Sequence, residues 1–212
     1  MAADQQSRFD RAAATWDLNP HRIQIALRTA DAIRDSVPIV PGMNALEIGC
    51  GTGLVTYPLS ECLASILAVD TSREMLNTLG EKMEQLGITN VTPHQADLTT
   101  DDLPGSGFDL IFSAMAMHHI PHPAAMIVRV AGLLKPGGSL CIVDLDAEDG
   151  SFHGNSEEVH HHGFSAQEMQ GYFSASGLSD LTSQTVVSFE RPGEDGVTRH
   201  YGVLMTLGRK AG

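Results

Sequence analysis

The stretch ALEIGCGTG at residues 45–53 combines an apolar run with glycine at every second position that follows it. From Leu54 the sequence becomes compatible with a helix, so the pattern predicts a strand, a tight turn and a helix N-terminus. Glycines in such a turn let the backbone adopt positive φ and come close to a ligand. Free N–H groups at the start of the helix favour an anionic group. The stretch therefore predicts a nucleotide-binding corner.

Beyond this corner, apolar strand-like segments alternate with segments of helical periodicity. Strands are expected at residues 65–70, 91–95, 108–113 and 139–145, and helices at 54–63, 72–86 and 124–134. Ser72 and Gly87 suit the two ends of one helix, and the sequence KPGG at 135–138 predicts a turn before the last of these strands. Such alternation is typical of a parallel sheet with helices on both faces.

The two ends of the chain differ from this alternating region. Apolar spacing predicts helices at residues 4–19 and from there to about Asp35, with Pro20 between them. Ser165 is expected to cap a helix that runs to about Ala175. Two β-rich runs, 181–189 and 200–207, joined through 191–196, predict a hairpin that adds antiparallel strands to one edge. The expected fold is a three-layer, Rossmann-like α/β sheet with a C-terminal hairpin and N-terminal helices.

Composition limits the classes of partner. With 212 residues and 42% hydrophobic residues, we expect a single domain at 1–212, in which an N-terminal helical lid at 1–36 covers a core at 37–212. The net charge of −13 disfavours nucleic acid and anionic membranes as partners. No apolar run reaches the length of a membrane span, so a cytoplasmic location is expected. The three cysteines, at 50, 62 and 141, are expected to be reduced.

Two ligands compete for the glycine-rich corner, a dinucleotide and S-adenosylmethionine. The dinucleotide fingerprint needs a glycine at position 54 after Gly49 and Gly51, where this chain has Leu54. Glu47 stands just before the turn, where its charge would oppose a pyrophosphate but would suit an ammonium and a sulfonium. These features favour S-adenosylmethionine as the ligand.

Carboxylates at two further strand ends fit the same ligand. Asp70 follows the strand at 65–69, where it can accept both ribose hydroxyls, although NAD would use such a residue in the same way. Asp97 follows the strand at 91–95 and offers an acceptor to an adenine amino group. Each residue alone could be a helix cap or a turn residue, and their joint spacing argues for a ligand site.

Five motifs in order resemble those of class I S-adenosylmethionine-dependent methyltransferases. They are EIGCGTG at 47–53, VD at 69–70, AD at 96–97, the segment from FD at 108 to His119, and LLKPGG at 133–138. Residues 9–17 resemble the opening of the small-molecule, ubiquinone/menaquinone-biosynthesis-like branch, methyltransferase type 11. The resemblance implies a seven-stranded, mostly parallel sheet, a lid made by the N-terminal helices, and S-adenosyl-L-homocysteine as product.

The resemblance also implies roles for individual residues. Asp70 would bind the ribose, Asp97 with Leu98 the adenine, and the backbone of Gly49 and Ser113 the methionine part. The full set that we expect to bind the cofactor is Glu47, Gly49, Cys50, Gly51, Gly53, Asp70, Thr71, Met75, Asp97, Leu98, Ser113 and Trp16.

Histidines are the candidates for assisting the chemistry. Methyl transfer from a sulfonium is an in-line displacement, so placing the nucleophile on the reaction axis can carry most of the rate. A general base is needed where the nucleophile must lose a proton early. His118 and His119 follow the strand at 108–113, and we expect His119 to take this polar role, with a packing role as the alternative.

A second group of histidines lies at residues 153 and 160–162, beside the acidic run 144–149. Consecutive histidines point in different directions, and no paired spacing typical of a metal site is present, so no metal is expected. The segment is interpreted as a loop over the active site in which either His161 or His162 faces the substrate, or as an exposed polar loop.

Taken together, the sequence predicts an enzyme that transfers a methyl group from S-adenosylmethionine to a small, partly apolar metabolite. One alternative is a non-catalytic module that binds the cofactor, and a further one is a nicotinamide-dependent oxidoreductase. The sequence leaves open the methyl acceptor, the atom that is methylated and the oligomeric state.

Overall fold

The computed structural model describes residues 8–102, 105–153, 159–192 and 196–212. Residues 1–7 of the expected lid, Pro104 before the strand at 108–113 and residues 193–195 of the hairpin connection lie outside these ranges. Among the described residues, no helix has both the length and the apolar character needed to cross a membrane. The three cysteines are free thiols.

A seven-stranded sheet forms the centre of the molecule, with the strand order β3-β2-β1-β4-β5-β7-β6. The strands are β1 (Asn44–Ile48), β2 (Ser65–Asp70), β3 (Val91–Gln95), β4 (Phe108–Ala114), β5 (Leu134–Leu145), β6 (Leu178–Pro192) and β7 (Thr198–Lys210). Strands β1 to β5 are parallel, whereas β7 runs antiparallel to both β5 and β6. The predicted fold class is confirmed.

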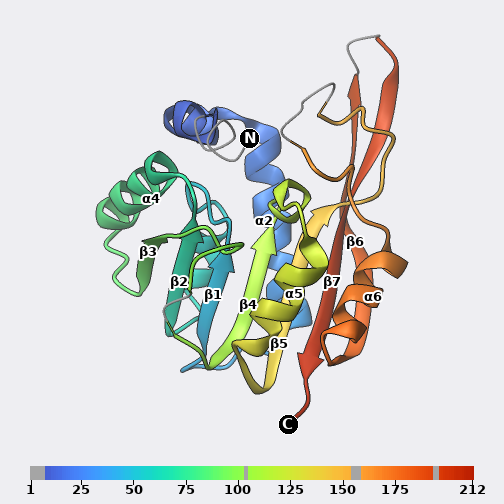
Figure 1. The fold of residues 1–212 in the computed structure, drawn as a ribbon. Coiled ribbons are helices and arrows are strands. Elements are labelled where there is room, and N and C mark those ends of the chain that lie inside the picture. Colours follow the sequence, from blue (N-terminus) through green and yellow to red (C-terminus); the bar gives the residue numbers. More distant parts are fainter. Residues whose placement is uncertain (1–7, 103–104, 154–158, 193–195) are drawn as a thin grey trace.

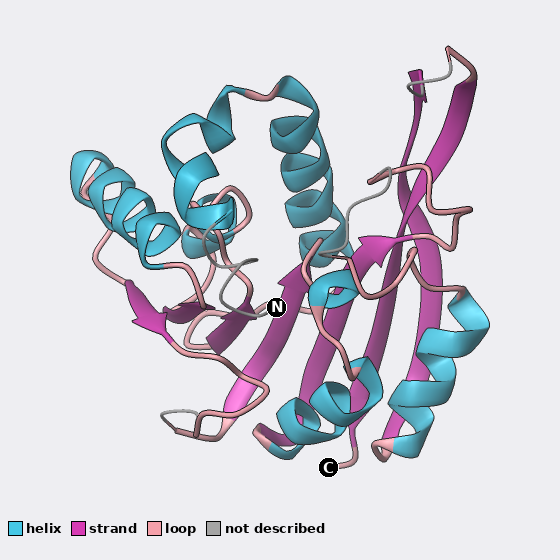
Figure 2. Ribbon diagram, turned by 45° about the horizontal axis from the view of Figure 1, so that its top comes forward, coloured by secondary structure: helices cyan, strands magenta, loops and turns pink. Residues whose placement is uncertain are grey.

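Helices cover both faces of the sheet (Figures 1 and 2). They are η1 (Ala13–Leu18), α2 (Pro20–Ser36), α3 (Thr56–Ser60), α4 (Arg73–Leu86), η2 (Met117–His119), α5 (Pro123–Gly132) and α6 (Ala166–Ala175). Apolar side chains of α2, α3 and α4 pack on one face in one core cluster, and those of α5 and α6 pack on the other face in a second cluster. The sheet is therefore the middle of three layers.

Local sequence signals set the ends of several helices. The Ser72 hydroxyl accepts a hydrogen bond from the Met75 N–H at the start of α4, and Gly87 ends that helix with φ of 69°. The Ser165 hydroxyl caps α6 in the same way. Pro93 lies in β3, where a missing N–H is tolerated because β3 is an edge strand that pairs only with β2.

Strand β5 departs from the prediction, because it begins at Leu134 and not after the KPGG sequence. Leu134 already pairs with Phe108, and the register then shifts before Leu110 pairs with Ser139. The glycines thus form an irregularity inside the strand. A Cβ on Gly138 would lie 3.0 Å from the carbonyl oxygens of Phe108 and Lys135, so the close approach explains the glycine.

The position of β1 determines where a ligand can bind. The chain proceeds from β1 to β2 and β3 on one side of the sheet and then crosses to β4 and β5 on the other side. In open α/β sheets, the crevice at such a switch point, at the carboxyl ends of the strands, is where ligands bind. The N-terminal segment, from residue 8 through η1, lies over this edge in Figures 1 and 2.

Candidate active site

A cavity of about 1130 Å³ opens at the carboxyl ends of β1, β2, β3 and β4. Its walls come from segments far apart in the sequence. They are the N-terminal helices at 8–29, the glycine-rich loop at 49–55, the strand ends at 69–71 and 95–101, the turn at 114–121, residues 152–153 and 160, and β6 at 189–191. The switch point of the sheet is therefore the floor of one large site.

The glycine-rich loop leaves space on the cavity side. Gly49 and Gly51 have φ of 67° and 54°, which L side chains rarely adopt. A Cβ on Gly49 would lie 2.4 Å from the Ala116 Cβ, whereas a Cβ on Gly51 would meet no protein atom within 4 Å. Gly53 differs, because a Cβ there would lie 2.2 Å from Leu79 of α4. Gly51 thus opens toward a ligand, and Gly53 serves helix packing.

Glu47 lies at the end of β1 and is almost completely buried, with 1% of its surface exposed. The Thr56 hydroxyl donates a hydrogen bond of 2.5 Å to its Oε2. Burial raises the pKa of Glu47 to about 8, against the lowering effect of the Thr56 hydrogen bond and with a smaller rise from the charge of Asp70. No ion pair joins Glu47 to a cation within the part of the chain that the structure describes, and a cationic ligand group would supply one.

Asp70 lies at the end of β2, beside the glycine-rich loop. Its Oδ2 accepts a hydrogen bond from the Gly51 N–H at 2.8 Å, and its Oδ1 accepts one from the Ser72 N–H at 2.9 Å. Burial raises its pKa, although hydrogen bonds from these backbone groups oppose the rise. Asp70 therefore ties the loop to the start of α4 while it faces the cavity.

Asp97 follows β3 and closes its own turn. Its Oδ1 accepts hydrogen bonds from the N–H and the hydroxyl of Thr99, at 2.9 and 2.6 Å. Its N–H donates to Asp101 Oδ2 at 2.9 Å. Asp97 and the buried Leu98 both line the cavity. Asp97 therefore closes its own turn and also lies at the cavity wall.

Most of the residues predicted to bind the cofactor line this cavity. These are Glu47, Gly49, Cys50, Gly51, Asp70, Thr71, Met75, Asp97, Leu98 and Trp16. Gly53 and Ser113 do not line it. The Ser113 hydroxyl is buried and donates to the Ile48 carbonyl at 3.0 Å, so its side chain links β4 to β1. Burial raises the pKa of the Cys50 thiol well above its ordinary value, which suits a packing residue.

The three predicted catalytic histidines have different places. His118 and His119 line the cavity, whereas His161 does not. The His161 Nε2 lies 3.1 Å from the Ile120 carbonyl, and its ring packs against Phe164 at 5.2 Å between centroids. His161 therefore links the turn after η2 to the segment before α6.

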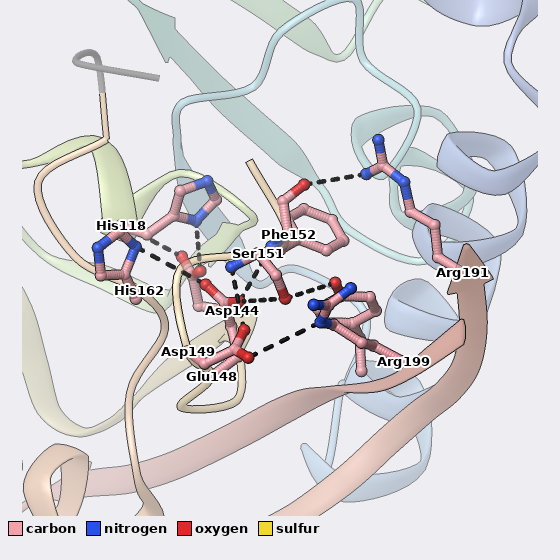
Figure 3. Close-up of polar contacts among 10 residues, drawn as sticks. His118, Asp144, Glu148, Asp149, Ser151, Phe152, His162, Arg191 and Arg199 are labelled. Atoms are coloured by element: carbon pink, nitrogen blue, oxygen red, sulfur yellow. Dashed lines mark hydrogen bonds and ion pairs between the residues drawn. The ribbon is translucent and has the colours of Figure 1, made fainter. Parts of the chain in front are cut away.

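His118 pairs with Asp144 at the end of β5 (Figure 3). The His118 Nδ1 lies 2.5 Å from Asp144 Oδ1, and both side chains are buried, with 2% and 3% exposed. Burial raises the pKa of Asp144, but the charge and the hydrogen bond of His118 outweigh it and hold this pKa below its ordinary value. The His118 Nε2 is buried and has no hydrogen-bond partner among the described residues.

Aromatic rings surround His118 on the cavity side. The ring centroids of His119 and His153 lie 4.1 and 4.9 Å from that of His118. Phe9 of the N-terminal segment contacts His119 edge-on at 5.2 Å. Burial, followed by the charge of His118, lowers the pKa of His153 to about 4, so its ring is neutral near neutral pH. These rings thus pack around the buried Asp144–His118 pair.

Charges are distributed unevenly along the cavity. Acidic side chains gather near the glycine-rich loop, namely Glu47, Asp70, Asp97 and Asp101. Three basic side chains line the cavity at the N-terminal helices and at β6, namely Arg8, Arg22 and Arg191, and the acidic Glu190 of β6 lines it beside them. The guanidinium of Arg22 stacks on Trp16 at 3.7 Å, and Arg191 donates to the Phe152 carbonyl at 3.1 Å. The charged lining is therefore acidic at the glycine-rich loop and mostly basic at the N-terminal helices and β6.

The N-terminal helices, which are predicted to act as a lid, are tied to the cavity rim by two sets of polar contacts. The Ser72 hydroxyl donates to Asp10 at 2.5 Å, at the start of α4. The Thr52 hydroxyl donates to Asp17 Oδ1, and Lys82 of α4 pairs with Asp17 Oδ2, each at 2.5 Å. The lid therefore touches both the glycine-rich loop and α4.

Among the cavity residues that the sequence-based prediction does not name are Arg22, Thr29 and Arg191. Arg22 and Thr29 belong to α2 and Arg191 to β6. The Thr29 hydroxyl is buried without a hydrogen-bond partner among the described residues. No local pattern marks these side chains, because the tertiary fold alone brings them to the cavity. In the described ranges, no three His, Cys, Asp or Glu side chains are grouped so as to hold a metal ion.

Comparisons with known proteins identify relatives of this chain. Residues 45–138 match the methyltransferase domain family. An uncharacterized methyltransferase of Schizosaccharomyces pombe is 32% identical over 154 residues, which cover 66% of this chain and 54% of the relative. A ubiquinone biosynthesis O-methyltransferase of Xanthomonas campestris is 30% identical over 165 residues, which cover 69% of this chain and 64% of the relative. The chain thus spans little more than half of the first relative.

Among solved structures, the DhpI–SAH complex resembles this chain over almost its whole length. The TM-score is 0.74 at 25% identity, and the match covers 98% of this chain and 95% of DhpI. The similarity extends beyond the glycine-rich corner to the helices and to the C-terminal hairpin.

Proposed function

Since the chain belongs to the class I S-adenosylmethionine-dependent methyltransferases, we propose that it transfers a methyl group from S-adenosylmethionine to a small, partly apolar metabolite. One observation supports the proposal most directly. A single cavity is lined by Gly51, where a Cβ would meet no protein atom within 4 Å, and by the carboxyl groups of Glu47, Asp70 and Asp97. Such a set fits a ligand with a ribose, an adenine and a cationic amino-acid part.

The residues of this cavity fit the cofactor in three ways. Gly51 leaves room for a ligand against the backbone, where a side chain would fill the space. Asp70 presents a carboxylate for the ribose hydroxyls, and Asp97 with Leu98 would flank the adenine. Glu47 would accept the ammonium of the methionine part, because it is a buried carboxyl without a cation. When bound, S-adenosylmethionine supplies a methyl group activated by a sulfonium.

The rest of the cavity supports the class of acceptor. Apolar and aromatic side chains line its lid side, among them Phe9, Ile25, Met115 and Phe152. Arg22 and the other basic side chains favour an acceptor that also carries a negative group. One relative is named for O-methyl transfer in ubiquinone biosynthesis, which also favours a small-molecule acceptor. Positioning the acceptor in line with the methyl group would contribute most of the rate.

Titration calorimetry with S-adenosylhomocysteine tests the donor site. Asp70→Asn keeps the size of the side chain but removes its charge, and we expect the affinity to fall about 10- to 100-fold, as for a lost charged hydrogen bond. Asp109→Asn is the matched control, because Asp109 pairs with Lys135 and does not line the cavity. Absence of binding to the wild-type protein, or unchanged affinity in Asp70→Asn, would contradict the proposal.

A second measurement separates an enzyme from a module that only binds the cofactor. The protein is incubated with methyl-labelled S-adenosylmethionine and a metabolite extract, and labelled products are identified by mass spectrometry. An enzyme is expected to produce a labelled small molecule. Binding without any labelled product would favour the non-catalytic alternative.

A further inference from the structure

The buried pair of Asp144 and His118 offers more than a structural tie. Asp144 accepts hydrogen bonds from the backbone N–H groups of Met117 at 2.8 Å and Leu145 at 2.7 Å, and a longer one from the His118 N–H. These bonds hold η2 against β5 without any imidazole. The imidazole adds one further bond to Asp144 and leaves its Nε2 buried and unpartnered among the described residues.

The carboxylate determines which nitrogen of His118 can act as a base. An ionised carboxylate accepts hydrogen bonds, so the neutral His118 ring carries its proton on Nδ1, toward Asp144. The lone pair is then on Nε2, at the edge of the ring that points away from Asp144 in Figure 3. This is the arrangement of a general base that is oriented by an acid.

The pair also lies close to the reacting end of the cavity. Ala116, two residues before His118, is the residue that a Cβ on Gly49 would strike. The turn at 114–119 therefore lies directly against the loop expected to hold the methionine part of the donor. His118 lines the cavity together with His119 and His153, whose rings pack against it. Its Nε2 is buried in the ligand-free structure, so an acceptor reaches this atom only when one of the two neighbouring rings moves aside.

We propose that His118, oriented by Asp144, is the general base of this chain and that the acceptor presents a hydroxyl group to its Nε2. The inference rests on the proposed methyl transfer and deepens it, because it makes the enzyme an O-methyltransferase. His118 is the catalytic residue, and Asp144 is a positioning residue. The sequence favours His119, but in the structure His118 is the histidine that the carboxylate orients.

The step balances in protons and charge. The hydroxyl proton of the acceptor passes to Nε2 of His118 while the oxygen forms its bond to the methyl carbon. The carbon–sulfur bond breaks, its electron pair stays on sulfur, and the sulfonium becomes a neutral thioether. The imidazolium that results is paired with the Asp144 carboxylate and later returns its proton to solvent. The acceptor leaves as a methyl ether.

Two phenols of different acidity provide the probes, catechol and 4-nitrocatechol, because the nitro group ionises its hydroxyl near neutral pH. In His118→Asn, the amide N–H₂ can still donate to Asp144, but the base is lost. At neutral pH we expect methylation of catechol to slow about 100-fold or more, and methylation of 4-nitrocatechol by less than about tenfold. His122→Asn is the matched control, because His122 is exposed and does not line the cavity.

Calorimetry with S-adenosylhomocysteine accompanies these rates. Failure of the wild-type protein to bind it would overturn the methyltransferase proposal itself. Equal binding in wild type and His118→Asn, together with an unchanged rate on catechol, would overturn the base alone. If the wild-type protein binds S-adenosylhomocysteine but labels only nitrogen or sulfur atoms of compounds in a metabolite extract, the hydroxyl acceptor is overturned.

A spectroscopic measurement on the wild-type protein tests the pair without relying on any variant to fold. Nitrogen-15 NMR of the imidazoles, with S-adenosylhomocysteine bound, is expected to show the neutral His118 ring protonated on Nδ1. A neutral ring protonated on Nε2 would overturn the proposal. In Asp144→Asn, the proton is expected to leave Nδ1 in a fraction of the molecules, and the methylation rate of catechol is expected to fall with it.

Discussion

The two ends of the cavity are built in different ways. The donor end is acidic, and its side chains stand at the carboxyl ends of β1, β2 and β3. The acceptor end holds arginines and histidines together with Glu190, and its side chains come from the N-terminal helices, the turn after β4, the loop after β5 and β6. The donor end is thus part of the sheet, whereas the acceptor end is assembled from the segments around it.

This difference matches what each end would have to bind. A donor with an ammonium and a sulfonium suits buried carboxylates, and burial raises the pKa of both Glu47 and Asp70. An acceptor with a hydroxyl and an acidic group suits arginines and an oriented imidazole. Opposite charges at the two ends would also keep each ligand from binding in the place of the other.

The sharpest way to test the donor end is to fill the space at Gly51. In Gly51→Ala, the new Cβ meets no protein atom but enters the cavity side of the loop. We expect the affinity for S-adenosylhomocysteine to fall about 100-fold, as overpacking at a contact costs about 1–3 kcal/mol. Calorimetry measures the affinity, and thermal unfolding measures the stability.

Gly87→Ala is the matched control for this variant. Gly87 has φ of 69°, close to the 54° of Gly51, and a Cβ on it would also meet nothing within 4 Å. Both variants are therefore expected to lose about 1 kcal/mol of folding stability. A loss of affinity in Gly51→Ala no larger than in Gly87→Ala would show that the loop does not touch the ligand.

The donor end could be predicted from the sequence because its parts are local. Strand, turn and helix signals lie within a few residues of Glu47, Asp70 and Asp97, and the sheet brings parallel strand ends to one edge. The exceptions have physical reasons. Gly53 is a glycine because Leu79 packs against it, and Ser113 points its hydroxyl at the Ile48 carbonyl. Their contact with the cofactor stays a prediction, since the Ser113 contact is expected through its backbone.

The acceptor end could be predicted only in part. The sequence predicts His118 and His119 as candidate bases because they follow a strand. Which of the two is oriented as a base depends on Asp144, which lies on another strand. Arg22 and Arg191 are separated by most of the chain, and no periodicity relates them. Short-range sequence patterns cannot show which distant segments of the chain come together in the fold. The early start of β5 was missed for a similar reason, since its pairing with Phe108 outweighs the turn signal of KPGG.

The pH dependence of binding tests the role of Glu47 at the donor end. In the ligand-free protein the pKa of Glu47 is about 8, so an ammonium bound beside it must displace a proton at lower pH. The affinity for S-adenosylhomocysteine is then expected to rise about tenfold per pH unit below this pKa and to level off above it. Glu47→Gln should remove this slope, whereas the exposed Glu84→Gln should keep it.

The same carboxyl affects the stability of the ligand-free protein. The unfolded chain releases the Glu47 proton near the ordinary value of 4.5, and the folded chain holds it up to about 8. Between these values the folded state binds more protons, so its stability contribution from Glu47 decreases as pH rises. Glu47→Gln should flatten this part of the stability profile. An equal slope in wild type and variant, in binding or in stability, would contradict a buried neutral Glu47.

The lid links the two ends, and Lys82 tests how much this link contributes. Lys82 pairs with Asp17 and also donates to the Thr52 carbonyl at 2.7 Å, so it joins α4, the lid and the glycine-rich loop. Both partners of the ion pair are partly exposed, and such a pair contributes about 1 kcal/mol at most. Lys82→Met should therefore speed the release of S-adenosylhomocysteine by about fivefold, measured by stopped-flow displacement.

Lys135→Met is the control for this smallest effect. Lys135 makes a comparable ion pair with Asp109, but neither residue lines the cavity. Its loss should cost a similar amount of folding stability and leave the release rate unchanged. If both variants release the ligand equally fast, the ion pair stabilises the fold and not the closed lid. If only Lys82→Met releases S-adenosylhomocysteine faster than the wild-type protein, the ion pair holds the lid over the donor end. Local sequence patterns do not reveal this contact, because Asp17 and Lys82 are far apart in the chain.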